Sequence, residues 1–166
     1  MNKIKRTLKH LLSARWQVAR VLPSSAMHRI QAAITESERL HDGELRFAVE
    51  PGLDWHQLGR GQTSRARAIE VFSQLRVWDT AHNSGVLIYL LLADRKVEIV
   101  ADRGIHAKVG QAGWETLCRH MERQFRAGAF EVGVLEGIAA ITELLQQHFP
   151  ALEDNPNELP DTPIVL

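Results

Sequence analysis

Oxygen-bearing side chains stand at the chain reversals around one apolar run, residues 86–92. Asp79 and Asn83 precede this run. Asp102 follows the next β-prone segment, and Asp42 precedes an earlier one. Carboxylates a few ångströms apart repel each other, and a hard divalent cation relieves the repulsion by taking them as ligands. Asp42, Asp79, Asn83 and Asp102 are therefore candidate ligands of Ca²⁺ or Mg²⁺, provided that the fold brings them together.

A second set of residues at the same turns favours an anion. Arg103, Ser84 and Gly85 form the predicted substrate- or anion-binding set. A simpler explanation of the Asp and Asn residues stays open, because Asp and Asn before a strand commonly accept hydrogen bonds from their own turn. His82 and His106 lie near these turns, where they either assist binding or are ordinary surface residues.

The elements that must position these residues form a βαβ unit in the predicted order. Residues 44–49 are β-prone, 64–77 carry apolar residues at helical spacing, and 86–92 are apolar on every side, as in a central strand. A tight reversal then leads into an alternating strand over 97–101. With the first two strands parallel and the third antiparallel, the start of the first, the start of the second and the end of the third meet at one sheet edge. That geometry would gather the candidate ligands.

Helical spacing also predicts helices over about 24–41, 114–125 and 134–149. With the strands they indicate a three-layer α/β sandwich, a short mixed β-sheet with helices on both faces. This domain would cover residues 24–150. Residues 151–166 contain several prolines and acidic residues, and we expect a disordered tail there.

Residues 1–23 predict a basic amphipathic helix with apolar residues at every fourth position. It has three possible contacts: its own domain, an anionic membrane surface, or a helix of a membrane-associated partner. The residues assigned to membrane or partner contact are Lys3, Lys5, Arg6, Lys9, Arg15 and Trp16. 

Charge and cysteine content narrow the classes of partner. Residues 1–30 hold seven of the 20 Lys and Arg and none of the 20 Asp and Glu, so the rest of the chain is acidic, which argues against broad nucleic-acid binding. The single cysteine, Cys118, lies on an apolar helical face and indicates an inert thiol in a reducing compartment. No apolar run approaches the ~20 residues of a membrane span. We therefore expect a cytoplasmic protein. Peripheral association with the inner face of the membrane is compatible with this location.

Two long segments, residues 71–105 and 109–150, resemble the TPM domain family, known from thylakoid-lumen proteins of photosystem II repair and from many bacterial proteins. The most specific matches are NSGVL at residues 83–87 and the later pattern of Phe125, Gly128, Phe130 and Gly133. The resemblance covers about residues 24–150. It implies an α/β sandwich and a divalent-metal site on loops at one edge of the sheet, and some members are described as acid phosphatases.

One turn departs from the family pattern. Many members carry Gly-Tyr-Gly-Leu-Glu after the third strand, whereas residues 101–105 here read ADRGI, so Asp102 would have to replace the glutamate. Three functional hypotheses follow: a cation-binding accessory module that acts with membrane-associated proteins, a metal-dependent acid phosphatase, and a structural interaction domain without a ligand. The sequence does not indicate an oligomeric state.

Overall fold

A mixed four-stranded sheet lies at the centre of the molecule, in the order β3-β2-β1-β4. The computed structural model describes residues 3–151 and 156–166. The strands are β1 (Leu45–Glu50), β2 (Val86–Leu91), β3 (Lys96–Ala101) and β4 (Ile164–Val165). β1 runs parallel to β2 and β4, and β3 runs antiparallel to β2. The predicted strand directions are therefore confirmed.

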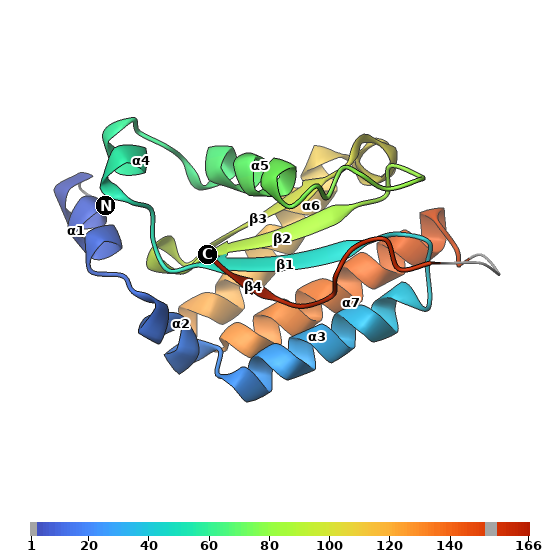
Figure 1. Cartoon of the computed structure of the whole chain (residues 1–166), viewed down its shortest axis with the longest axis horizontal. Helices are drawn as coiled ribbons and strands as arrows, with labels where there is room; N and C mark the ends of the chain where they lie inside the picture. Colours follow the sequence, from blue (N-terminus) through green and yellow to red (C-terminus); the bar gives the residue numbers. More distant parts are fainter. Residues whose placement is uncertain (1–2, 152–155) are drawn as a thin grey trace.

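Helices cover both faces of the sheet, as the α/β sandwich prediction requires (Figure 1). One face packs against α3 (Ser24–Glu38), α6 (Arg103–Arg126) and α7 (Phe130–His148), and the other against α5 (Ser64–Gln74). Every residue of β1 and of β2 is buried, and alternate side chains enter the two cores. Burial of each such large apolar side chain stabilises the fold by about 1.5–3 kcal/mol.

The N-terminal segment is two helices, where the pattern predicted one. α1 (Lys3–Leu11) and α2 (Arg15–Val21) are separated by a turn, at which the Ser13 hydroxyl donates to the Lys9 carbonyl. A side chain that bonds to the preceding turn of backbone competes with helix continuation, which explains the break. α2 belongs to the main core, because Val18 and Leu22 are buried there.

Two further elements differ from prediction. α6 starts eleven residues before the predicted 114, at Arg103, and kinks at Gly110, whose φ is +73°. Three glycines in its first half obscured the helical pattern. The short helix α4 (Trp55–Gly59), which is not among the predicted elements, starts at a capping box between Asp54 and Gln57.

Residues 156–166 are not the disordered extension that the composition of 151–166 predicts. The Glu44 carboxylate accepts hydrogen bonds from the backbone N–H groups of Glu158 and Leu159, at 3.0 Å each. Leu159 is buried in the core beneath α5, and β4 pairs with β1. A buried carboxylate and an apolar terminal run therefore outweigh the proline content of the segment. Glu153 and Asp154 lie outside the described residues.

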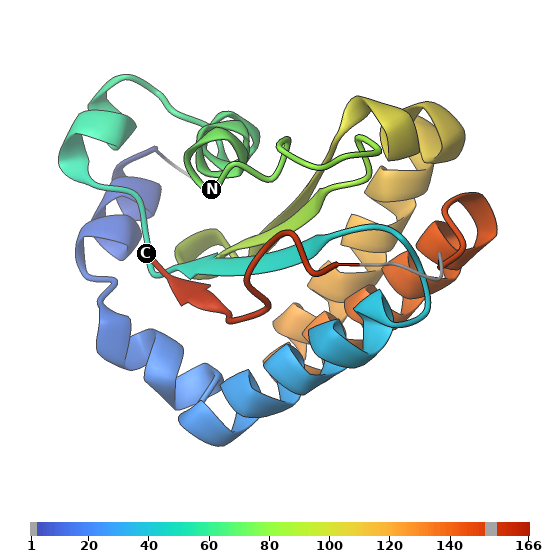
Figure 2. The same cartoon turned by 45° about the vertical axis from the view of Figure 1, so that its right-hand side comes forward.

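The two ends of the sheet carry different features (Figures 1 and 2). The starts of β1 and β2 lie at one end, with the end of β3. α1 and the end of the C-terminal strand lie toward the opposite end, where α1 contacts the short 3₁₀ turn η1 (Leu92–Asp94) that follows β2.

Candidate functional site

Three chain reversals converge at one end of the sheet, and we call residues 42–43, 79–85 and 102–104 the rim. The Asp102 N–H donates to the Gly85 carbonyl at 2.8 Å, and the Gly104 N–H donates to the Asn83 carbonyl at 3.1 Å. The Ser84 hydroxyl donates to the Asp42 carbonyl at 3.0 Å. The predicted convergence of these turns is therefore confirmed, and backbone hydrogen bonds hold them together.

Two rim glycines permit this close approach. A Cβ on Gly85 would lie 1.9 Å from the Val77 carbonyl oxygen, and one on Gly104 would lie 2.5 Å from the Asn83 carbonyl oxygen. Both contacts are with backbone, which cannot move aside as a flexible side chain can. The NSGVL and ADRGI turns therefore need glycine at these positions in order to pack against their neighbours.

Asp102 stands at the N-terminus of α6, where the helix dipole favours a negative charge. One carboxylate oxygen, Oδ1, accepts from the Arg103 N–H at 2.7 Å. The other, Oδ2, is buried and has no hydrogen-bond partner in the described part of the chain. A buried polar atom without a partner carries a desolvation cost, which a bound ligand at this oxygen would offset.

Basic side chains of the rim itself contact two of the other candidate ligands. His82 forms an ion pair with Asp42, and Arg103 Nε donates to Asn83 Oδ1 at 3.0 Å. Asn83 adopts a left-handed backbone conformation, with φ of +53°, which Asn tolerates better than most residues. These contacts partly compensate the negative charge that the sequence places here.

Asp79 does not join the other three ligands in the same way. It is exposed, and its backbone N–H donates to the Arg76 carbonyl in a turn. Across residues 3–151 and 156–166, no group of three or more His, Cys, Asp or Glu side chains is arranged to hold a metal ion. The rim thus brings together the turns that carry Asp42, Asn83 and Asp102, but within the described residues it does not form a set of three acidic, His or Cys ligands.

The residues predicted for anion binding use their polar groups inside the rim. Ser84 is buried, and its N–H donates to Thr80 Oγ1 at 3.1 Å while its hydroxyl bonds to Asp42. The carbonyl of Gly85, which is also buried, accepts from Asp102. Arg103 alone of this set is exposed, and its Nε bonds to Asn83.

A buried Ser–His pair lies just before the rim and was not identified from the sequence. Ser37 Oγ lies 2.7 Å from His41 Nε2 and 2.6 Å from Thr142 Oγ1. Burial lowers the pKa of His41 to about 4, against a smaller opposing effect of its hydrogen bond with the Gly43 N–H. Through the contact with Thr142, Ser37 joins α3 to α7. Ser37 and His41 are both buried, so the pair is shielded from solvent. The i, i+4 spacing of Ser37 and His41 is the signal that could have indicated it.

Cys118 has the character that its sequence position predicts. Burial raises the pKa of its thiol to about 11, with a smaller opposing contribution from a backbone hydrogen bond at Ile99. The thiol is therefore protonated at neutral pH and is a weak nucleophile.

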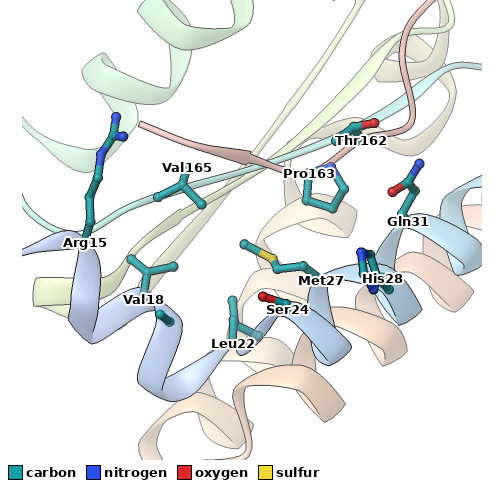
Figure 3. A pocket seen from close by; sticks show the side chains of 11 residues that line it. Arg15, Val18, Leu22, Ser24, Met27, His28, Gln31, Thr162, Pro163 and Val165 are labelled. Carbon is teal, nitrogen blue, oxygen red and sulfur yellow. The ribbon is translucent and has the colours of Figure 1, made fainter.

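An apolar pocket of about 420 Å³ lies near the end of the sheet opposite the rim, between α2, α3 and the C-terminal segment. Val18, Met27 and Val165 lie around the same space, with Leu22 and Pro163 close by (Figure 3). Arg15 and His28 also line it. None of the residues proposed for the rim contributes to this pocket.

The comparison with family models decides the classification. The model of the TPM domain matches residues 17–144. The chain belongs to the TPM domain family. The match starts within α2 and ends within α7, so it covers β1, β2, β3 and the rim but not α1 or β4.

Two solved structures are similar to this chain. The chain is similar to the BA42 protein of the psychrophilic bacterium Bizionia argentinensis, known from an NMR structure, with 30% identity, a TM-score of 0.73, and coverage of 87% of this chain and 95% of that one. It also shares its fold with the N-terminal domain of a P. gingivalis protein solved by NMR, at 18% identity, a TM-score of 0.64, and coverage of 80% and 83%. Among curated proteins the comparison found no significant match.

Proposed function

We propose that this TPM domain is an accessory module that binds a divalent cation, Ca²⁺ in preference to Mg²⁺, at the rim. The observation that carries the proposal is the Asp102 Oδ2 atom, which is buried without a hydrogen-bond partner in the described residues. It lies on a turn hydrogen-bonded to the turn of Asn83, which in turn bonds to that of Asp42. A cation would supply the missing partner.

The chemistry of the ligand set supports Ca²⁺ and a modest affinity. Asp42 and Asp102 would hold the ion, with the Asn83 amide oxygen and rim carbonyls as neutral ligands, and Asp79 would join only through movement of its turn. Ca²⁺ accepts such mixed oxygen ligands in irregular geometry, whereas Mg²⁺ demands a near-ideal octahedron. Sites with few carboxylates bind Ca²⁺ with Kd on the order of 10⁻⁴–10⁻³ M.

Two basic side chains of the rim compete with the metal. His82 contacts Asp42 and Arg103 contacts Asn83, so both contacts must weaken for the cation to bind. A bound divalent cation would neutralise the carboxylates and attract an anionic ligand at its remaining coordination positions. The exposed Arg103 would then face the same anion, which gives it a role in selecting what the loaded rim contacts.

Isothermal titration calorimetry of the full chain with Ca²⁺ and with Mg²⁺ tests the proposal. We expect saturable heat with Ca²⁺, reduced about 10- to 100-fold in affinity by Asp102→Asn, which keeps the oxygen that caps α6 but removes the charge. Glu115→Gln is the matched control, because Glu115 is an exposed carboxylate in the middle of α6. Absence of Ca²⁺ heat at millimolar concentration, or equal heat in Asp102→Asn and in Glu115→Gln, contradicts the proposal.

The phosphatase hypothesis is separated by a turnover assay. Ser37 is buried with His41, and Cys118 is protonated, so neither supplies an accessible activated nucleophile. Hydrolysis would then depend on water activated by the metal. Turnover of a generic phosphomonoester that a chelator and Asp102→Asn both abolish would favour the enzyme, and heat without turnover would favour the accessory module.

A further inference from the structure

α1 docks on its own domain through its polar face. Arg6 Nε and Nη2 donate to Asp94 Oδ2 at 3.0 and 2.9 Å. On the same side of the helix, His10 is 2% exposed, with Nε2 3.0 Å from Asp94 Oδ1, and its Nδ1 accepts from the Leu53 N–H at 2.9 Å. An ion pair and a buried histidine therefore hold α1 in place.

The apolar face of α1 points away from the protein as a consequence. Ile4, Leu8 and Leu11 lie on one side of the helix, opposite Arg6, and each is at least 53% exposed. Leu12 and Trp16 extend this surface across the turn to α2, with exposed fractions of 66% and 61%. We call these five side chains the outer apolar face. An isolated exposed Leu is ordinary, but contiguous apolar surface of this kind marks an interaction site.

Basic side chains surround the outer apolar face. Lys5, Lys9 and Arg20 are exposed, and none of them forms an ion pair with a carboxylate within residues 3–151 and 156–166. Arg15, which the sequence assigned to the same surface, lines the apolar pocket on the other side of α2 instead. The first acidic residue in the sequence is Glu36. The side chain of Lys3, which the sequence assigned to the same surface, lies outside the described residues.

Apolar and basic groups also meet in one surface hollow. Leu12 and Trp16 line a depression of about 510 Å³ together with Lys9, Arg20 and Arg95. Its lining, as far as the chain is described, contains no Asp or Glu. A tryptophan beside Lys and Arg is the combination that proteins place at the boundary between lipid headgroups and acyl chains.

We infer that the outer apolar face of α1 and α2 docks on an anionic lipid surface. No helix among the described residues is long and apolar enough to cross a bilayer, so the helices would lie in the interface with Leu8 and Leu12 toward the acyl chains. Charge complementarity selects this occupant, because Lys5, Lys9 and Arg20 would face anionic headgroups. A protein partner would need its own carboxylates at matching positions. The inference is independent of cation binding at the rim.

Flotation of the full chain with vesicles tests the inference. We expect binding to vesicles of equal parts phosphatidylcholine and phosphatidylserine, and little to phosphatidylcholine alone. Because each basic residue near an anionic leaflet contributes about fivefold, Lys5→Gln with Lys9→Gln should weaken binding about 30-fold. Leu8→Gln with Leu12→Gln should weaken it roughly a hundredfold, since two leucine side chains lose their apolar contact.

Ile69→Gln is the matched control, because Ile69 is an exposed apolar residue on α5, away from α1. It should bind vesicles as the wild type does. The thermal midpoints of all variants should also equal that of the wild type, because every substituted side chain is exposed. Equal flotation with both vesicle types overturns the inference. A lower thermal midpoint for the double leucine variant also overturns it, because those side chains would then lie in a protein core. A third contrary result is that the wild type binds no vesicles but self-associates in sedimentation, and that the double leucine variant does not self-associate, which would assign the face to a second copy.

Discussion

The two ends of the sheet use charged side chains in contrasting ways. At the end near η1, Asp94 receives Arg6 and His10 from a helix more than 80 residues away in sequence, and this long-range contact fixes α1 with its apolar side outward. At the rim, Asp42 and Asp102 have partners from the rim itself, and one oxygen of Asp102 has none in the described chain. Near η1 the charged side chains hold α1 in place. At the rim, one carboxylate oxygen is left without a hydrogen-bond partner among the described residues.

The largest expected effect breaks the rim. Gly85→Ala places a Cβ 1.9 Å from the Val77 carbonyl oxygen, so the β2 entry and the preceding turn must separate. We expect a loss of about 3 kcal/mol in the free energy of unfolding, the upper part of the usual range for overpacking. Chemical denaturation monitored by circular dichroism measures it.

Gly59→Ala provides the control for that substitution. A Cβ at Gly59, the last residue of α4, meets no atom within 4 Å. Its stability should equal or slightly exceed that of the wild type, because alanine restricts the unfolded chain more than glycine does. Similar losses in both variants would show that the rim packing does not depend on the close approach at Gly85.

A smaller effect is expected at the other end, from Asp94→Asn. The substitution weakens charge-assisted hydrogen bonds to Arg6 and His10, and we expect a loss of about 1.5 kcal/mol that is confined to the docking of α1. Amide hydrogen exchange over residues 3–11 should accelerate, while exchange in β1 and β2 stays unchanged. Faster exchange throughout the sheet would contradict a local role for this contact.

The pH dependence of α1 docking adds a second measurement. Burial opposes ionisation of Asp94, but hydrogen bonds from His10 and Arg6 outweigh it and lower its pKa from 3.8 to about 2. A carboxylate with a lowered pKa in the folded state contributes stability above its ordinary pKa and loses it as the pH falls. Docking of α1 should therefore weaken from about pH 4 toward pH 2 in the wild type, and this dependence should be absent in Asp94→Asn.

The rim was predictable from the sequence because strand polarity alone determines it. Parallel β1 and β2 with antiparallel β3 must bring residues 42, 85 and 102 to one edge, whatever the side chains do. Side-chain detail was not predictable in the same way. Whether Asp79 turns toward Asp102, and whether Arg103 bonds to Asn83, depends on loop conformations that no periodicity encodes.

The orientation of α1 and the order of the tail escaped prediction for a related reason. The amphipathic pattern gives α1 an apolar and a polar face, and burial of apolar surface would favour docking through the apolar face. Asp94 makes the polar face dock instead, and no local sequence pattern indicates this distant contact. The tail is fixed by Glu44, more than 100 residues earlier in the sequence. Long-range contacts of single carboxylates decided both.

The smallest expected effect concerns Asn83, the proposed neutral ligand of the rim. Arg103 is exposed, and its contact with Asn83 Oδ1 opposes cation binding, so Arg103→Ala should raise Ca²⁺ affinity about two- to fivefold, the worth of one exposed charge contact. Arg119→Ala, an exposed arginine elsewhere on α6, should leave the affinity unchanged. Calorimetry resolves the difference, and unchanged affinity in Arg103→Ala would mean that Asn83 is not a ligand. Arg103→Ala and Arg119→Ala should have the same free energy of unfolding, because the exposed contact between Arg103 and Asn83 contributes little to the fold. In this respect it differs from the contacts that Asp94 makes with Arg6 and His10.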